Sequence, residues 1–71
     1  MKLHFERVKA GYYVWQAFDR YIAIYRNKNN WFVLFRNTFK EKTGTYEVDN
    51  LKKGIEFSNL YFDDFEAMLT D

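Results

Sequence analysis

The residues that could perform chemistry are few and stand far apart in this sequence. His4 is the only imidazole and Ser58 the only serine, and Ser58 lacks the Gly-x-Ser-x-Gly setting that exposes a nucleophile. Asp63 and Asp64 are adjacent carboxylates, but neighbouring residues on a helix do not face each other, so a paired acid–base role is not expected. We therefore predict no catalytic residues and expect the protein not to be an enzyme.

The residues that usually bind metals and cofactors are also scarce. The chain has no cysteine, which excludes a cysteine-based zinc site, and a single histidine leaves few other ligand sets. Neither a P-loop nor a Gly-x-Gly-x-x-Gly run occurs. The sequence predicts no metal and no cofactor.

Residues suited to binding a partner are more abundant, because Phe, Tyr and Trp make up 23% of the 71 residues. This length allows one domain, expected to span residues 1–71, whose core is small because a chain of this size buries only about 60% of its unfolded surface. Each buried aromatic side chain removes roughly 150–250 Å² from water. The aromatic residues must therefore supply much of the packing.

The elements that position these residues are predicted mainly as strands. Gly11, Gly44 and Gly54 stand where extended segments should reverse, and Asp19-Arg20 is a plausible tight turn. The loop Asn27-Lys28-Asn29-Asn30 is the clearest hairpin signal, because Asn tolerates the left-handed conformation. Alternating and aromatic-rich runs predict strands at residues 3–8, 12–18, 21–26, 31–37 and 45–49, with a short one at 55–62.

The C-terminus changes to a helical period. Phe62, Phe65 and Leu69 fall on one helical face, and Asp63-x-x-Glu66 has the spacing of a capping box. The helix is predicted to begin near Asp63, with a start at Asn59 as the alternative. We predict an α+β fold: a four- to six-stranded antiparallel sheet with one short C-terminal helix packed on one face.

One short helix covers one face of such a sheet, yet the central strands carry large apolar groups on both faces. We place the aliphatic set on the helix side and predict a core of Phe5, Val14, Ile22, Ile24, Val33, Phe35, Val48, Phe62, Phe65 and Leu69. The opposite face then holds Tyr13, Trp15, Tyr21, Tyr25 and Phe32, and arginines stand at its edge. The predicted partner-binding residues are Tyr13, Trp15, Tyr21, Tyr25, Arg26, Phe32 and Arg36. The alternative is a sheet that curls into a barrel-like form and buries both sets.

The identity of the partner stays open between protein and nucleic acid. Residues 1–44 carry a net charge of +6 and residues 45–71 a net charge of −5, so a basic face is possible, although the two halves could also neutralise each other. A protein partner, including a second copy in a homodimer, fits an aromatic face edged by arginines. Single-stranded nucleic acid is the alternative, since Arg20, Lys28 and Trp31 add to an aromatic and basic hairpin.

No apolar run approaches the ~20 residues that a membrane-spanning helix needs, and Met1–Glu6 lacks the apolar region of a signal peptide. We therefore expect no membrane partner and a cytoplasmic location.

Two resemblances add expectations. The run Arg20–Tyr25, with Leu34 and Phe39–Thr43, resembles the strand pair of RelE/HigB-type ribosome-dependent ribonuclease toxins, which makes such a toxin a further alternative. The wider layout of Gly11-Tyr12, Tyr21–Arg26, Asn29–Val33 and Tyr61–Ala67 is similar to small orphan proteins of bacteriophages and mobile elements. That resemblance implies an inhibitor or modulator, of anti-defence or anti-CRISPR type, that docks on a host protein or nucleoprotein in the host cytoplasm.

Overall fold

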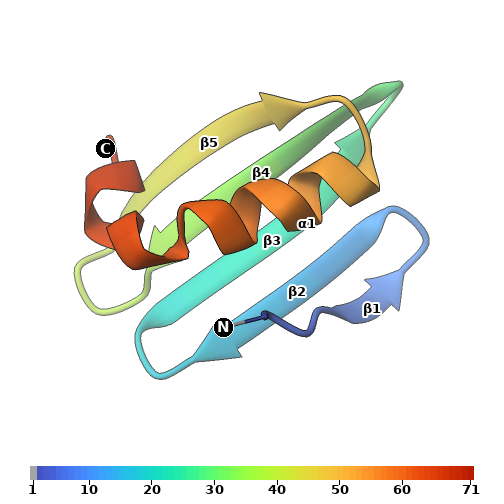
Figure 1. The fold of residues 1–71 in the computed structure, drawn as a ribbon. Coiled ribbons are helices and arrows are strands. Elements are labelled where there is room, and N and C mark those ends of the chain that lie inside the picture. The colour runs from blue at the N-terminus through green and yellow to red at the C-terminus, as the bar shows by residue number, and fades with distance from the viewer. Residues whose placement is uncertain (1) are drawn as a thin grey trace.

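The computed structural model describes residues 2–71 and shows one antiparallel sheet with a helical segment on one side (Figure 1). The strands lie in chain order: β1 (Glu6–Lys9), β2 (Tyr12–Ala17), β3 (Arg20–Asn27), β4 (Asn30–Asn37) and β5 (Lys42–Val48). Helix α1 (Leu51–Leu60) and the 3-10 helix η1 (Phe62–Met68) follow. The predicted α+β class, with an antiparallel sheet and a C-terminal helix, is confirmed.

Tight turns join the central strands. Asn27 pairs with Asn30 and leaves Lys28-Asn29 as the turn, with Lys28 at φ 62°, which confirms the predicted hairpin loop. Ala17 pairs with Arg20, so the preceding turn is Phe18-Asp19 and lies one residue earlier than predicted. Phe18 adopts φ 55° there, in the left-handed region that suits glycine better than a bulky side chain.

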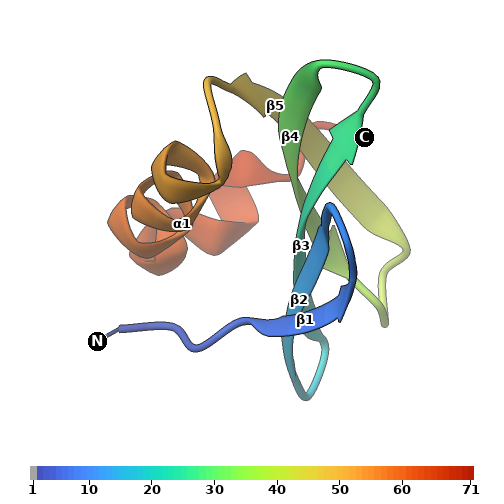
Figure 2. The same cartoon turned by 90° about the vertical axis from the view of Figure 1, so that its right-hand side faces the viewer.

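The N-terminal segment leaves the sheet before β1 begins. The strand predicted at residues 3–8 starts only at Glu6, and the residues before it run out on the helix side (Figure 2). Leu3 is 4% exposed and its backbone N–H donates to Asn59 Oδ1 at 2.7 Å. This segment therefore helps α1 to cover the same face.

The prediction of a strand at residues 55–62 is wrong, because helix α1 occupies most of this stretch. Asn50 caps the helix, because its side-chain oxygen accepts the Lys53 N–H at 2.9 Å. Gly54 marks no turn but sits where the helix crosses the sheet, and a Cβ atom there would lie 2.8 Å from Ile24 Cγ2. The buried residues of α1 are Gly54 and Ser58, which are small enough for a close approach.

The helix predicted to begin near Asp63 is the 3-10 helix η1, which begins at Phe62, so its position is right and its type is not. The alternative start at Asn59 is wrong, because Asn59 lies within α1. Within the described residues 2–71 no side chain caps η1, and the Glu66 carboxylate does not fold back to form a capping box. It accepts hydrogen bonds from Lys40 Nζ at 3.1 Å and from the Asn37 amide at 3.4 Å. These bonds, led by the one from Lys40, hold the pKa of Glu66 below its usual value and tie η1 to the β4–β5 loop.

The core lies between the sheet and the helical layer. Its buried cluster consists of Leu3, Ile22, Ile24, Val33, Phe35 and Phe65. Phe5, Val48, Phe62 and Leu69 pack against it as predicted. The prediction is wrong for Val14, which pairs with Ala23 on the opposite face of the sheet. Most of the core was therefore assigned correctly from aliphatic and helical spacing.

Phe65→Ala should lower the free energy of unfolding by about 3–5 kcal/mol, measured by urea denaturation. Phe65 is 1% exposed and its ring meets Phe35 edge-on with centroids 5.5 Å apart, so truncation leaves a cavity. Phe39→Ala, at a ring 87% exposed, is the matched control and should change stability by less than about 0.5 kcal/mol. Equal effects of the two substitutions would contradict the docking of η1.

Gly44→Ala should cost about 1–3 kcal/mol of stability, because an added Cβ would overlap the main-chain carbonyl of Met68. Thr45→Ala, at the exposed neighbouring position, is its control and should be nearly neutral. Thermal unfolding of the two variants measures the difference. A Gly44→Ala protein as stable as the parent would show that η1 does not end against β5.

Candidate partner-binding surface

The face of the sheet turned away from α1 is uncovered by any other element within residues 2–71 (Figure 2). Residues that pair directly across antiparallel strands point to the same face, so the register defines its members. This surface, called the open face below, consists of Tyr12, Val14 and Gln16 on β2, Tyr21, Ala23 and Tyr25 on β3, Phe32, Leu34 and Arg36 on β4, and Thr43, Thr45 and Glu47 on β5.

The structure brings four of the predicted binding residues together on the open face: Tyr21, Tyr25, Phe32 and Arg36. The prediction that Tyr13 and Trp15 share this face is wrong, and Arg26, predicted at its edge, lies on the other side of the sheet. Tyr13 and Trp15 pair with Ile24 and Ile22, and Arg26 pairs with Trp31, all on the helix side. Register decides the face, and it overrides the sorting of aliphatic from aromatic residues.

The displaced residues have packing roles on the helix side. The Trp15 ring meets Phe62 edge-on at 5.2 Å between centroids, and the Tyr13 ring lies 6.5 Å from Trp31. The Arg26 guanidinium sits over Trp31, 5.9 Å from its centroid. Trp15 and Tyr13 are therefore part of the wall of the core.

Two tyrosines lie along the centre of the open face. Tyr12 and Tyr21 sit at opposite ends of the β2–β3 pair, about 14 Å apart along the strands, yet their hydroxyls meet at 2.7 Å. Both rings must therefore lean inward along the sheet. Ala23, which lies between them, is 1% exposed although no helix covers this face. The open face thus has a centre built by its own side chains.

The Tyr21 hydroxyl stays protonated well above neutral pH. Burial, followed by the hydrogen bond with Tyr12, raises the pKa of Tyr21 to about 12, and the nearby Arg36 charge only partly opposes this. Tyr21 is therefore a neutral phenol at physiological pH. It can exchange hydrogen bonds with a partner, but it is not a base.

An aromatic stack lies next to Tyr12, which pairs directly with Tyr25. Tyr25 and Phe32 pair directly across β3 and β4, with ring centroids 5.5 Å apart and planes 27° apart. Leu34 lies beside Ala23 in the next pair along β4. A continuous apolar strip therefore runs from the tyrosine pair to this stack.

Charged groups stand at the margins of the strip. Arg36 donates to both carboxylate oxygens of Glu41, at 2.9 and 3.2 Å. Glu6 pairs with Val14 at the β1 margin, and Glu47 pairs with Phe32 at the β5 margin. Arg20, predicted for this region, lies on the helix side over Phe62 and Phe65, 5.3 and 5.0 Å from their centroids.

Sequence reasoning missed two phenylalanines at neighbouring loop tips. Phe18 is 98% exposed and Phe39 is 87% exposed. Their loops are joined because the Thr38 N–H donates to the Asp19 carbonyl at 2.8 Å. The buried Asn37 braces both, donating to Asp19 Oδ2 and accepting the Phe39 N–H at 3.0 Å. The sequence could have indicated Phe18, because a large apolar residue inside a tight turn has no core to pack against and is left exposed.

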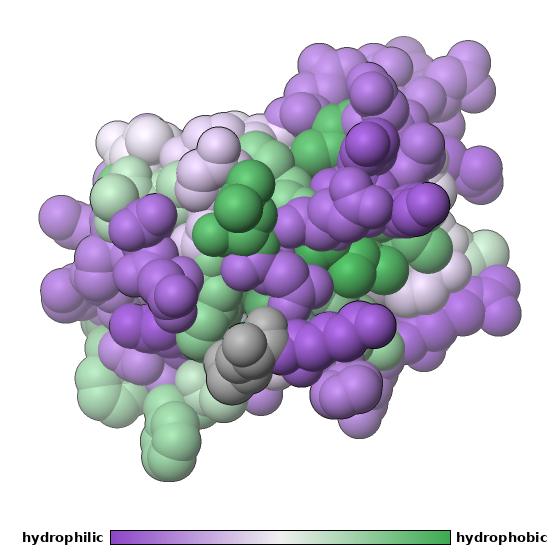
Figure 3. All heavy atoms as spheres, viewed as in Figure 1, coloured by the Kyte–Doolittle hydropathy of each residue, from purple (hydrophilic) through white to green (hydrophobic). Residues whose placement is uncertain are grey.

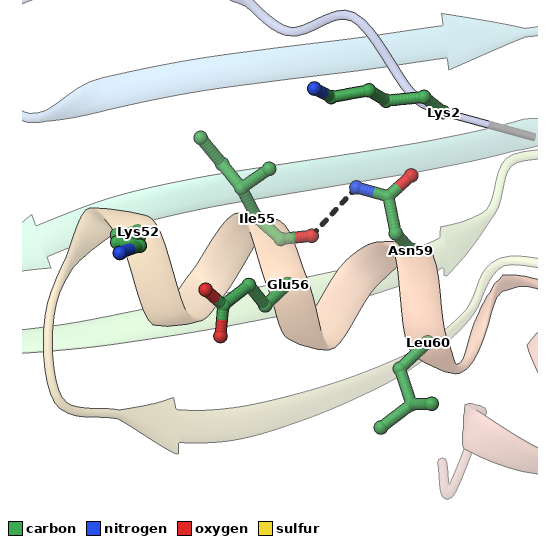
Figure 4. A pocket seen from close by; sticks show the side chains of 6 residues that line it. All are labelled: Lys2, Lys52, Ile55, Glu56, Asn59 and Leu60. Carbon is green, nitrogen blue, oxygen red and sulfur yellow. Dashed lines mark hydrogen bonds between the residues drawn. The ribbon is translucent and has the colours of Figure 1, made fainter.

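The helix side offers a groove but little reactive chemistry. An open hollow of about 570 Å³ borders α1 and is lined by Lys2, Lys52, Ile55, Glu56, Asn59 and Leu60 (Figure 4). The Asn59 amide is engaged with the Ile55 carbonyl at 2.9 Å. Within residues 2–71, no cluster of three or more His, Cys, Asp or Glu could hold a metal, and no helix is long and apolar enough to cross a membrane.

Comparison of the chain with protein-family models, with curated proteins and with solved structures found no match.

Raising the pH through the window from 10 to 12 should destabilise the protein more than it destabilises Tyr21→Phe. The pKa of Tyr21 is higher in the folded state, so its stabilisation is full below pH 10 and is lost as the pH rises toward 12. Titration of tyrosinate absorbance should show a late-titrating phenol that Tyr21→Phe lacks and Tyr25→Phe keeps. A late phenol that survives in Tyr21→Phe would contradict the assignment.

Proposed function

We propose that this protein is a non-enzymatic binding module that docks on a partner protein through its open face. The observation that carries the proposal is the apolar strip formed by Tyr12, Tyr21, Tyr25, Phe32 and Leu34, which no other element within residues 2–71 covers. A contiguous apolar surface of this kind usually marks an interaction site, and tyrosine is enriched in interfaces because one end is apolar and the other polar.

The strip is also organised before any partner arrives. The Tyr12–Tyr21 hydroxyl contact and the Tyr25–Phe32 stack fix four rings in place. Ordered aromatic side chains lose little conformational entropy when they bind, which favours them as anchors of an interface. Arg36, held by Glu41, stands at the edge of the strip as a hydrogen-bond donor.

A protein partner is favoured over single-stranded nucleic acid by the distribution of charge. A nucleic-acid surface needs cations beside its aromatic rings to follow the phosphates. Here Arg20 and Arg26 stack on rings of the helix side, Arg36 is paired with Glu41, and Glu6 and Glu47 border the strip. The aromatic rings of the open face are thus separated from most of the basic residues that the nucleic-acid hypothesis needs.

The finer role rests on resemblance alone. Similarity to small orphan proteins of bacteriophages and mobile elements makes the partner a host protein or nucleoprotein and the role that of an inhibitor or modulator. A homodimer through the open face is the same proposal with a second copy as partner. The ribonuclease-toxin alternative loses support, because described residues 2–19 form an irregular segment, β1 and β2 where that family has helices.

The test is affinity capture from a bacterial lysate, with and without nuclease, using the parent protein and Tyr25→Ala/Phe32→Ala. We expect the parent to retain one stoichiometric protein in both conditions. The double variant should bind that protein at least about 100-fold more weakly, since each anchor is worth about 2 kcal/mol. Sedimentation of the parent alone measures homodimerisation through the same face.

The control is Lys52→Ala/Phe39→Ala, at two exposed residues that belong neither to the open face nor to the groove beside β5. Thermal unfolding confirms that both double variants are folded. Trp15 is not a useful target, because it packs on Phe62 and its loss would disturb folding. Loss of every partner after nuclease treatment would favour nucleic acid, and an unchanged affinity of Tyr25→Ala/Phe32→Ala would rule out the open face.

A further inference from the structure

Strand β5 ends the sheet, and its outer backbone edge is only partly occupied. The Thr43 carbonyl accepts the N–H groups of Thr70 and Asp71, at 2.9 and 3.0 Å, so the backbone groups of Thr43 point away from β4. In an antiparallel strand the direction alternates with each residue, so Thr45 and Glu47 also point outward. Within residues 2–71, neither has a hydrogen-bond partner on that side.

An apolar groove lies beside this free edge on the helix side. Val48, Phe57 and Leu60 supply its apolar lining, and it encloses about 330 Å³ between β5 and α1. Figure 1 shows α1 crossing in front of β3 and β4, with β5 at the edge of the sheet beyond it. Figure 3 shows strongly apolar atoms at the surface between the charged side chains of this side. Leu60 is 70% exposed, so its side chain is accessible to a segment lying in the groove.

The rim of the groove is acidic. Its charged residues are Glu47, Asp49, Lys53 and Glu56. Lys53 pairs with Glu56 at 3.6 Å. Among residues 2–71, no cation lies within 4 Å of the carboxylates of Glu47 and Asp49. The Glu47 side chain points to the open-face side of the sheet. A strand added to the β5 edge would therefore have its open-face side chains next to Glu47.

We propose that the β5 edge is a strand-addition site for an extended peptide segment with alternating apolar and basic residues. The segment adds antiparallel to Thr45–Asp49 and hydrogen-bonds the free groups of Thr45 and Glu47. Its apolar side chains enter the groove over Val48, Phe57 and Leu60. Its basic side chains lie on the open-face side, beside Glu47.

A second copy of the chain is a poorer occupant. Two β5 edges paired antiparallel, with Thr43 still engaged by the C-terminal residues, would bring Thr45 of each copy opposite Glu47 of the other. The two Glu47 side chains would then be diagonal neighbours on the same face, about 7–8 Å apart, and like charges at that range oppose association. A basic segment meets the same rim with complementary charge.

The test uses a synthetic peptide, acetyl-Lys-Val-Lys-Val-Lys-Val-Lys-amide, with the full chain labelled for NMR. At saturation we expect shifts of the Thr45, Glu47 and Leu60 amide signals. The amide hydrogens of Thr45 and Glu47 should exchange at least about tenfold more slowly, because they gain partners. Shifts confined to β1 or to the open face, or unchanged exchange at Thr45 and Glu47, would overturn the proposal.

Matched peptides make the result specific. In antiparallel pairing the residues that bond Thr45 and Glu47 have side chains on the open-face side, which are the lysines. N-methylation of the lysine amides should therefore weaken binding about tenfold or more, while N-methylation of the valine amides should not. Equal effects of the two N-methylated peptides would rule out strand addition.

Charge and groove are tested separately. Replacing the peptide lysines by glutamate, or Glu47→Lys in the protein, should weaken binding by about fivefold or more. Leu60→Ala should weaken it as well, whereas Val8→Ala, at an exposed residue of the opposite edge, should not. A glutamate peptide that binds as tightly as the lysine peptide would overturn the charge assignment and with it the proposed partner.

Discussion

The close approach of α1 to one face of the sheet is the constraint on which the rest of the structure depends. Gly54 and Ser58 are the buried residues of the helix, and Gly54 lies directly over Ile24. Ser58 keeps its hydroxyl satisfied by donating to the Gly54 carbonyl at 2.8 Å, so close packing costs no unpaired polar group. The helix and the Leu3 segment then form one layer, which seals the face containing Val33 and Phe35.

The single layer determines the character of both faces. On the covered side the aromatic rings of Trp15, Trp31 and Phe57 pack against the core and need no partner. On the open side, the strands still carry large side chains, and these must pack against one another. The Tyr12–Tyr21 contact and the Tyr25–Phe32 stack are the result, and they bury Ala23 without any helix. The same arrangement leaves an ordered apolar surface for binding.

The sequence allowed the hairpin at 27–30, both faces of β3 and β4 and most of the core to be predicted, because these follow from short-range alternation. The faces of β2 were wrong since residue type was preferred to register. A two-residue turn pairs odd positions with even ones, which alone would have put Trp15 on the same face as Ile22 and Ile24. Helix α1 was missed because Gly54 resembles a turn signal, and only tertiary contact with Ile24 reveals its packing role.

The most direct measurement is the solvent accessibility of methyl groups in the monomeric protein, read by NMR relaxation with a soluble paramagnetic agent. Val14 and Leu34 lie on the open face, whereas Ile24 and Val33 lie under α1 and are fully buried. The account predicts strong relaxation of the Val14 and Leu34 methyl signals and almost none for Ile24 and Val33. Val14 and Leu34 methyls as protected as those of Ile24 would contradict an open face.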